Sequence, residues 1–193
     1  VSRSERPEVR AQAMSILAGI GSLRPEIVLE RMSDPHAGVR AQAARWAGGM
    51  TEDDPRFGPA LVRLAADPAI TVRFQTAISL AAYDDAEVGQ ALGCIAMSDP
   101  DDAWIRAAVL SAATRHPASL LQAVLKIASQ RRLPPPGELV GPIVATMAGT
   151  GDPDDLAKSI ETLTHSEPES GERIASWRLT ALSELLSARR VAS

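Results

Sequence analysis

The sequence predicts an all-α protein built as an α-solenoid, a right-handed superhelix of stacked antiparallel helix pairs. Three observations predict it. The 193 residues include 33 alanines, aromatic residues make up only 3%, and one short motif recurs about every thirty residues. Alanine has the highest helix propensity, whereas strands favour β-branched and aromatic residues. A repeat of this length is typical of helix pairs that bury their apolar faces by stacking on one another.

The recurring motif is an arginine that follows a β-branched residue. Its four copies are spaced by 30, 33 and 33 residues, and in three of them an Asp-Pro pair precedes the arginine by six or seven residues. The arginines are Arg10, Arg40, Arg73 and Arg106, after Val9, Val39, Val72 and Ile105, and the aspartates are Asp34, Asp67 and Asp99. Chance rarely places one pattern four times in register, so each copy predicts one structural unit.

Each unit is predicted to contain two helices. We expect the three aspartates to cap the first helix of their units and the following proline to occupy its first turn. In the first unit, apolar residues at helical spacing predict an inward face of Val9, Ala13, Ile16, Leu17 and Ile20. The shorter second helices are expected near residues 26–32, 59–66 and 87–97.

The pattern divides the chain into two parts. Residues 1–115 form the regular repeats, and residues 116–193 form degenerate repeats that end in a capping helix and continue the same solenoid. Helices are expected at 119–130, 138–148, 154–164 and 172–189, with Trp177 in the core of the last. Three consecutive prolines, at 134–136, cannot continue a helix and predict a rigid connector.

The repeated Asp-Pro-x(3–4)-Val/Ile-Arg before an alanine-rich helix resembles the HEAT-like repeat of the phycobilisome-lyase type. Residues 67–80, 99–111 and 177–186 more specifically resemble the HEAT region of planctomycete-type haem-binding, c-type cytochrome, membrane-bound dehydrogenases. That resemblance implies a helical segment between a propeller and a cytochrome domain, in an exported or periplasmic protein; otherwise we expect a cytoplasmic one. The chain has no Cys-x-x-Cys-His haem motif, so no cofactor is expected here.

The aspartates and arginines of the motif are candidates for a structural ladder. An arginine at the same position of every unit can bridge an aspartate of its own or an adjacent turn and hold the stack in register. The ladder comprises Asp34, Arg40, Asp67, Arg73, Asp99 and Arg106. Gln12, Gln42 and Gln75 follow two residues after three of the arginines, and they form either a ladder across repeats or a polar strip on the surface.

Candidate partner-binding residues are Gln42, Arg45, Trp46, Gln75 and Trp104. Trp46, beside Arg45, stands where other units have smaller or aliphatic residues, so it is either a protein-binding anchor or a filler of the alanine-rich core. Trp104 follows Asp101 and Asp102 at the start of its helix, and we expect it to pack against the preceding pair.

No catalytic, cofactor-binding or metal-ligating residue is predicted. The histidines His36, His116 and His165 are far apart, Cys94 is the single cysteine and is expected to be buried, and acidic clusters fall in turns. No apolar run reaches the length of about 18–20 residues that spans a bilayer, so membrane insertion is not expected. A net charge of −4 makes nucleic acid an unfavourable partner.

The sequence therefore favours a non-enzymatic scaffold, a segment of a larger multidomain protein whose concave surface binds a protein partner or flanking domains of the parent chain. The alternative is a HEAT-fold enzyme of the alkylpurine DNA glycosylase type, in which Trp46 with Arg10, Arg40, Arg45 and Arg73 forms a local basic strip. Bilin lyase or isomerase activity rests on the name of the repeat alone.

Overall fold

The computed structural model describes residues 4–51 and 54–150 together with the single residues 157, 161 and 183. All regular structure in this part of the chain is helical, which confirms the predicted class. The helices are α1 (Pro7–Gly19), α2 (Pro25–Arg31), α3 (Ala37–Gly48), α4 (Phe57–Leu64), α5 (Ile70–Leu80), α6 (Glu87–Ser98), α7 (Ala103–Ala112), the 3₁₀ turn η1 (Ala113–Arg115), α8 (Pro117–Arg131) and α9 (Gly137–Thr150). Of the helices predicted at 154–164 and 172–189, all but three residues lie outside the described part, Trp177 among them.

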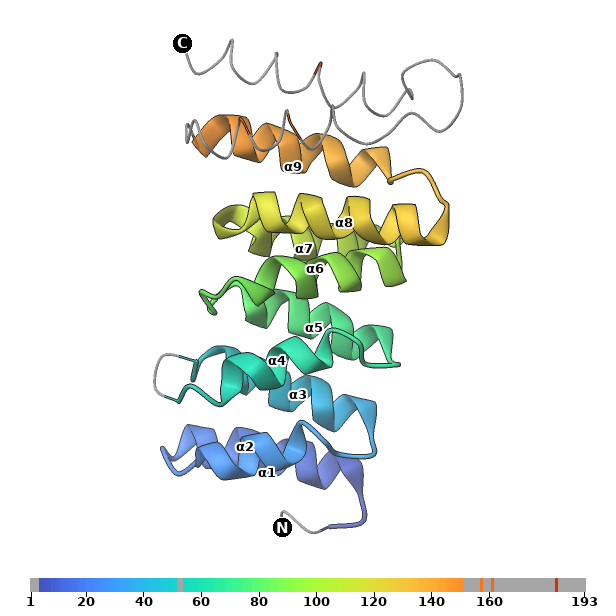
Figure 1. Ribbon diagram of the computed structural model, residues 1–193. Coiled ribbons are helices and arrows are strands. Elements are labelled where there is room, and N and C mark those ends of the chain that lie inside the picture. The colour runs from blue at the N-terminus through green and yellow to red at the C-terminus, as the bar shows by residue number, and fades with distance from the viewer. Residues whose placement is uncertain (1–3, 52–53, 151–156, 158–160, 162–182, 184–193) are drawn as a thin grey trace.

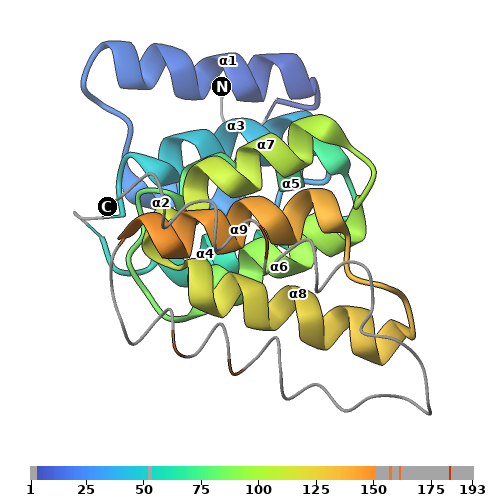
Figure 2. The same ribbon diagram turned by 90° about the horizontal axis from the view of Figure 1, so that it is seen from above.

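The helices form a two-layered stack (Figure 1). One layer contains α1, α3, α5 and α7, each in contact with the next, and the other contains α2, α4, α6 and α8 (Figure 2). The connector at 133–136 then leads to α9, which contacts both α7 and α8 and so continues the stack. This arrangement of antiparallel pairs is an α-solenoid. None of the described helices is long and apolar enough to cross a membrane.

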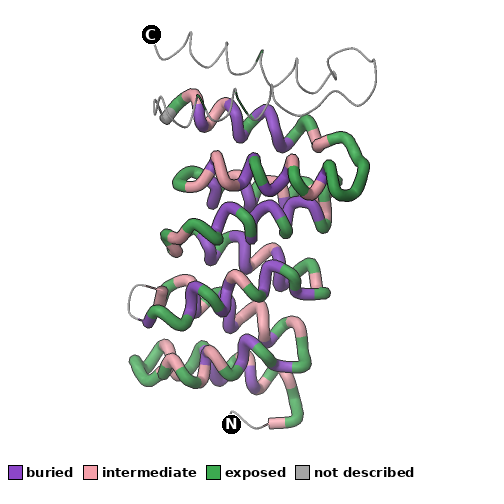
Figure 3. Tube along the Cα trace, in the orientation of Figure 1, coloured by how far each residue is buried: buried purple, intermediate pink, exposed green. Residues whose placement is uncertain are grey.

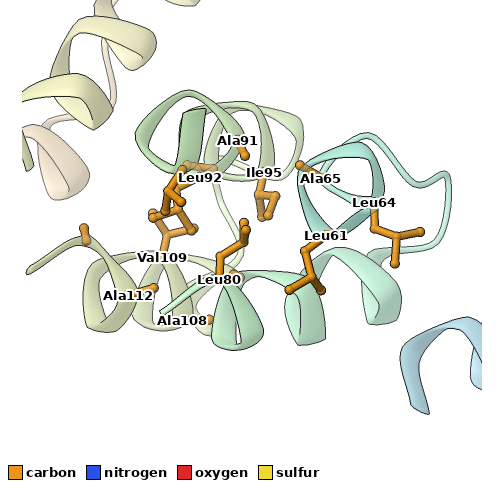
Figure 4. Close-up of a cluster of buried hydrophobic side chains, with 14 of the residues drawn as sticks. Leu61, Leu64, Ala65, Leu80, Ala91, Leu92, Ile95, Ala108, Val109 and Ala112 are labelled. Atoms are coloured by element: carbon orange, nitrogen blue, oxygen red, sulfur yellow. The ribbon is translucent and has the colours of Figure 1, made fainter. Parts of the chain in front are cut away.

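The hydrophobic core lies between the two layers and runs through the stack (Figure 3). Alanine is its commonest residue, and Phe57 is the only aromatic side chain among the described residues that is fully buried. In the middle of the stack, Leu80, Ile95 and Val109 from three helices gather at one place (Figure 4). The alanine-rich composition is therefore explained by small buried residues, with larger aliphatic residues at intervals.

Two glycines allow α6 and α8 to pack closely. A Cβ atom added to Gly93 would lie 2.5 Å from the Cβ of Ala123, and one added to Gly89 would lie 1.9 Å from the Oγ of Ser119. Both distances are shorter than a van der Waals contact, so the second layer depends on residues without side chains at these points.

The prediction that Asp34, Asp67 and Asp99 cap the following helices is wrong. The helices α3 and α5 begin three residues after the aspartate and have no side-chain cap. Instead, Asp34 Oδ1 accepts the backbone N–H of His36 at 3.0 Å, and Asp67 makes the same bond two residues on, at 2.9 Å. In the fourth unit the loop has one extra residue, and Asp102 caps α7. The repeated carboxylates thus shape the turns before the helices, which leaves them free to face arginines.

The predicted inward face of α1 is only partly correct. Ala13 is buried, but Ile16 and Ile20 are 57% and 68% exposed. Ser79, at the repeat position of Ile16, lies against Gly48 of the preceding unit. Because α1 is the first described helix of the stack, no described unit covers Ile16 and Ile20.

The prediction that Cys94 is buried is also wrong. Cys94 is exposed as a free thiol. The buried face of α6 includes Val88, Leu92 and Ile95, and Cys94 lies on the other side of the helix. A helix that is mostly small and apolar still has a solvent face, which its composition does not reveal.

Candidate partner-binding site

The motif arginines lie at one edge of the stack, where each contacts the next unit. Arg10 donates to both carboxylate oxygens of Asp34, from Nε to Oδ2 and from Nη2 to Oδ1, each at 2.7 Å. Arg40 makes the same two bonds with Asp67, at 2.7 and 2.8 Å. Planar, two-point contacts of this kind are the strongest that a carboxylate makes with a side chain. The partner of each arginine is therefore the aspartate of the following unit and not that of its own.

The series continues with altered geometry in the later units. Arg73 donates from Nε and Nη2 to a single oxygen of Asp99, at 2.8 and 2.5 Å. Arg106 forms an ion pair with Glu138 at the start of α9, at 2.7 Å. Sequence reasoning missed this glutamate because it follows the prolines and not an Asp-Pro pair, and because it lies 32 residues after Arg106, farther than the 24–27 residues that separate the other pairs.

Each arginine also contacts its own unit. Arg40 Nη1 donates to the carbonyl oxygen of Asp34 at 2.9 Å, and Arg73 Nη1 donates to that of Asp67 at 2.6 Å. One guanidinium therefore joins the loop before its own helix to the carboxylate of the next unit. We call this series of contacts the arginine ladder.

The buried carboxylates of the ladder remain ionised. Arg10 lowers the pKa of Asp34 well below its usual range, although burial acts in the opposite direction. Burial raises the pKa of Asp67, but hydrogen bonds from Arg40 and from the Ala69 N–H outweigh it, and the net change is downward. The same contacts raise the pKa values of Arg10 and Arg40. These groups are fully engaged with one another and offer no free acid or base.

The two glutamines differ in their contacts. Gln42 donates from Nε2 to Ser15 Oγ of the first unit at 3.2 Å, whereas Gln75 donates to Ser79 Oγ of its own helix at 3.3 Å. Only Gln42 bridges two repeats. Gln42 and Gln75 therefore do not make equivalent contacts, and Gln12 is exposed.

The indole of Trp46 is half-buried against the core. Its Nε1 is buried, and the described residues give it no hydrogen-bond partner. Arg45 beside it is exposed, but Arg10, Arg40 and Arg73 are held by aspartates. Of the four arginines in the basic strip considered for a nucleic-acid-binding enzyme, Arg45 is therefore the one for which the described residues provide no ion-pair partner.

Trp104 has the most exposed large apolar side chain in the described part of the chain, at 75%. The expectation that it packs into the preceding helix pair is wrong, because it stands at the rim of an open groove between α5 and α7. The groove has a volume of about 350 Å³ and is lined by Ile70, Thr71, Phe74, Asp102, Trp104 and Ile105. We call it the α5–α7 groove.

The apolar wall of the groove belongs to one face of α5. Ile70 is 40% exposed, Phe74 is half-buried, and Ile78, four residues further on, is 44% exposed. Residues four apart lie on the same side of a helix. The exposed apolar surface therefore extends along α5 beyond the groove itself.

The bulky residues of this surface depart from the repeat. The residue after the ladder arginine is Phe74 in the third unit but alanine in the other three, Ala11, Ala41 and Ala107. At the position of Trp104 the other units have Glu8, Gly38 and Thr71, and at that of Ile70 they have Pro7, Ala37 and Ala103. Stacking does not require large side chains here, since the other units stack without them. Comparison of the repeats in register would have revealed Ile70 and Phe74, which the sequence analysis did not single out.

The acidic end of the groove is formed by the loop before α7. Asp102 Oδ1 accepts the backbone N–H groups of Trp104 and Ile105, both at 2.9 Å. Asp101 beside it is exposed. Neither carboxylate has an ion-pair partner among the described residues. Elsewhere in the described ranges, no three His, Cys, Asp or Glu side chains gather closely enough to hold a metal ion.

Stacked helix pairs with the same arginine–carboxylate contact between successive units define a repeat protein of the α-solenoid class. Residues 25–114 match the family model for HEAT repeats. The match runs from α2 to α7 and includes every residue that lines the α5–α7 groove. No curated protein and no solved structure matches the chain. The resemblance to planctomycete-type dehydrogenases finds no support in these comparisons.

Proposed function

We propose that the chain is a non-enzymatic protein-interaction scaffold and that the α5–α7 groove binds a segment of a partner protein. One observation carries the proposal: bulky apolar residues are exposed at repeat positions where the other units have mainly small or polar ones. Trp104 is 75% exposed, so it contributes little to the core. Tryptophan and phenylalanine are enriched at the centres of protein interfaces, where they supply most of the binding energy.

The arginine ladder has a structural role in this proposal. The groove has one wall from the third unit and one from the fourth, so its width depends on how the two units are spaced. Arg73 directly precedes Phe74 on α5, and its partner Asp99 lies in the loop that leads to Trp104. This pair therefore fixes one wall of the groove relative to the other, and the scaffold presents a surface that is formed before the partner arrives.

An enzyme on the same fold is the weaker alternative. A glycosylase of the alkylpurine type needs a basic groove beside an aromatic side chain and a carboxylate. Here three of the four arginines considered together with Trp46 are neutralised by aspartates. The open groove between α5 and α7 is largely apolar and has the carboxylate of Asp102 in its lining, which favours a protein segment over nucleic acid.

The proposal is tested by selecting displayed random heptapeptides on the immobilised full chain. The selected peptides are then synthesised with a fluorescent label, and their affinities are measured by anisotropy. We expect the double variant Trp104→Ala/Phe74→Ala to bind them at least tenfold more weakly than the wild type. Ile20→Ala is the matched control, because Ile20 is equally exposed but lies at the far end of the stack, and its affinities should stay within twofold. Equal binding by the double variant, or failure to select any peptide, overturns the proposal.

A further inference from the structure

We infer that the α5–α7 groove selects partner segments in which an apolar side chain is accompanied by an arginine or lysine. The apolar side chain enters between Phe74 and Trp104, and the cation lies beside Asp101 and Asp102. The inference rests on the proposed function, because it names the chemistry of the partner at the same groove.

The charges around the groove are unbalanced. The two nearest ladder arginines, Arg73 and Arg106, are paired with Asp99 and Glu138, so they leave no net positive charge. Asp101 and Asp102 have no such partner in the described part of the chain. The N-terminus of α7 adds a partial positive charge of about half an elementary charge, which is too small to offset two carboxylates. The edge of an otherwise apolar groove is therefore negative.

The carboxylate of Asp102 is held in place by hydrogen bonds to only one of its two oxygen atoms. Its Oδ1 accepts both bonds from the start of α7, and no described group donates to Oδ2. The cap fixes the side chain at the lining of the groove, so a cation gains a pre-positioned acceptor.

Trp104 completes the site for a cation. Its exposed indole lines the same groove as Asp102, and a guanidinium or ammonium group over such a ring is attracted by its quadrupole. Arginine suits this arrangement best, because its planar group can stack on the ring and donate to a carboxylate together.

The exposed apolar face of α5, which extends from the groove to Ile78, sets the length of the segment. From Ile70 to Ile78 the apolar face of α5 spans about 12 Å at 1.5 Å per residue. An extended segment of about four residues covers this distance. A short peptide therefore suffices to fill the groove, and a folded partner domain is not required.

The test uses the heptapeptides selected on the full chain and one further variant, Asp101→Asn/Asp102→Asn. Asparagine caps helices as well as aspartate does, so this variant removes two charges and keeps the cap of α7. We expect the selected peptides to carry arginine or lysine near an apolar residue. Affinity should fall at least fivefold in the double-asparagine variant, or when the basic residue of the peptide becomes glutamine. When the double-asparagine variant is combined with the glutamine-substituted peptide, affinity should fall little further than with either change alone.

A scrambled peptide of the same composition controls for unspecific attraction to an acidic protein and should bind at least fivefold more weakly. Peptides without basic residues, or unchanged affinity in the double-asparagine variant, overturn the inference. In either case, if the selected peptides still bind Trp104→Ala/Phe74→Ala more weakly than the wild type, the proposed function stands while the charge preference fails. If they bind Trp104→Ala/Phe74→Ala as tightly as the wild type, or if no peptide is selected, both fail.

Discussion

The arginine ladder and the α5–α7 groove occupy the same edge of the stack but relate to the repeat in opposite ways. The ladder is made of residues that recur from unit to unit, whereas the groove is made of residues that depart from the repeat. The ladder recurs in each unit, and its carboxylates at Asp34 and Asp67 are buried and saturated with hydrogen bonds. The groove lies between the third and fourth units, where Ile70, Phe74 and Trp104 replace the mainly small or polar residues of the other units. We infer from this difference that the repeated positions of this chain serve stability, and we propose that the departure from the repeat at the groove serves binding.

The largest effect is expected from breaking the ladder. Asp34→Ala removes a fully buried carboxylate, which leaves Arg10 without its carboxylate partner and Arg31 with only the exposed Glu30. Removal of one partner from a buried ion pair costs about 3 kcal/mol or more of unfolding free energy, which denaturant titration followed by circular dichroism measures. The control Asp101→Ala removes an exposed carboxylate and should change stability by less than about 0.5 kcal/mol. Equal losses in the two variants would contradict the distinction.

A smaller loss is expected from widening the contact between α6 and α8. Gly93→Ala places a methyl group 2.5 Å from the Cβ of Ala123, so the two helices must move apart. Overpacking of this kind costs about 2 kcal/mol. Gly19→Ala on α1 has no neighbour within 4 Å and should leave the thermal midpoint unchanged or slightly raised. If Gly93→Ala is as stable as Gly19→Ala, the close approach of the second layer does not contribute to stability.

The contribution of the ladder to the unfolding free energy should also depend on pH. This effect is smaller than those of the two substitutions above, but its sign is defined. The pKa of Asp34 is lowered in the folded state, so its contribution is fully present above its unfolded pKa, near 4, and is lost as the pH falls below that value. The stability difference between the wild type and Asp34→Asn should therefore narrow by about 1 kcal/mol between pH 7 and pH 2.5. Thermal unfolding of both proteins at several pH values measures it. If the stability difference between the two proteins is the same at every pH in this range, the charge of the Asp34 carboxylate does not contribute to stability.

The helices and the repeated arginines could be predicted from the sequence, but the pairing between units and the burial of some residues could not. The helices from α1 to α9 and the repeated arginines follow from local pattern, since propensity and apolar spacing act within a few turns. The choice between an aspartate of the same unit and that of the next depends on how units stack, which is a tertiary property. Ile16 and Cys94 were misplaced for a related reason, because an apolar period does not show whether a neighbour covers it.

The groove was harder to predict because its walls belong to residues about thirty positions apart. Trp104 was a candidate from sequence, but its exposure was not foreseen. Phe74 was overlooked although it stands where three other units have alanine. The signal was present in the register of the repeats and not in any single segment, so repeat proteins are best searched for function by their departures from their own pattern.

The smallest effect is expected where the groove itself is altered. Trp104→Ala removes a side chain that is 75% exposed and should change the unfolding free energy by less than about 0.5 kcal/mol. Phe74→Ala restores the alanine of the other units and should cost only about 1 kcal/mol, because its ring is half-buried. The matched control is Phe57→Ala, which removes a fully buried ring and should cost about 3 kcal/mol or more. If Trp104→Ala were as destabilising as Phe57→Ala, the bulky residues would be required by the stack, and their departure from the repeat would no longer point to binding.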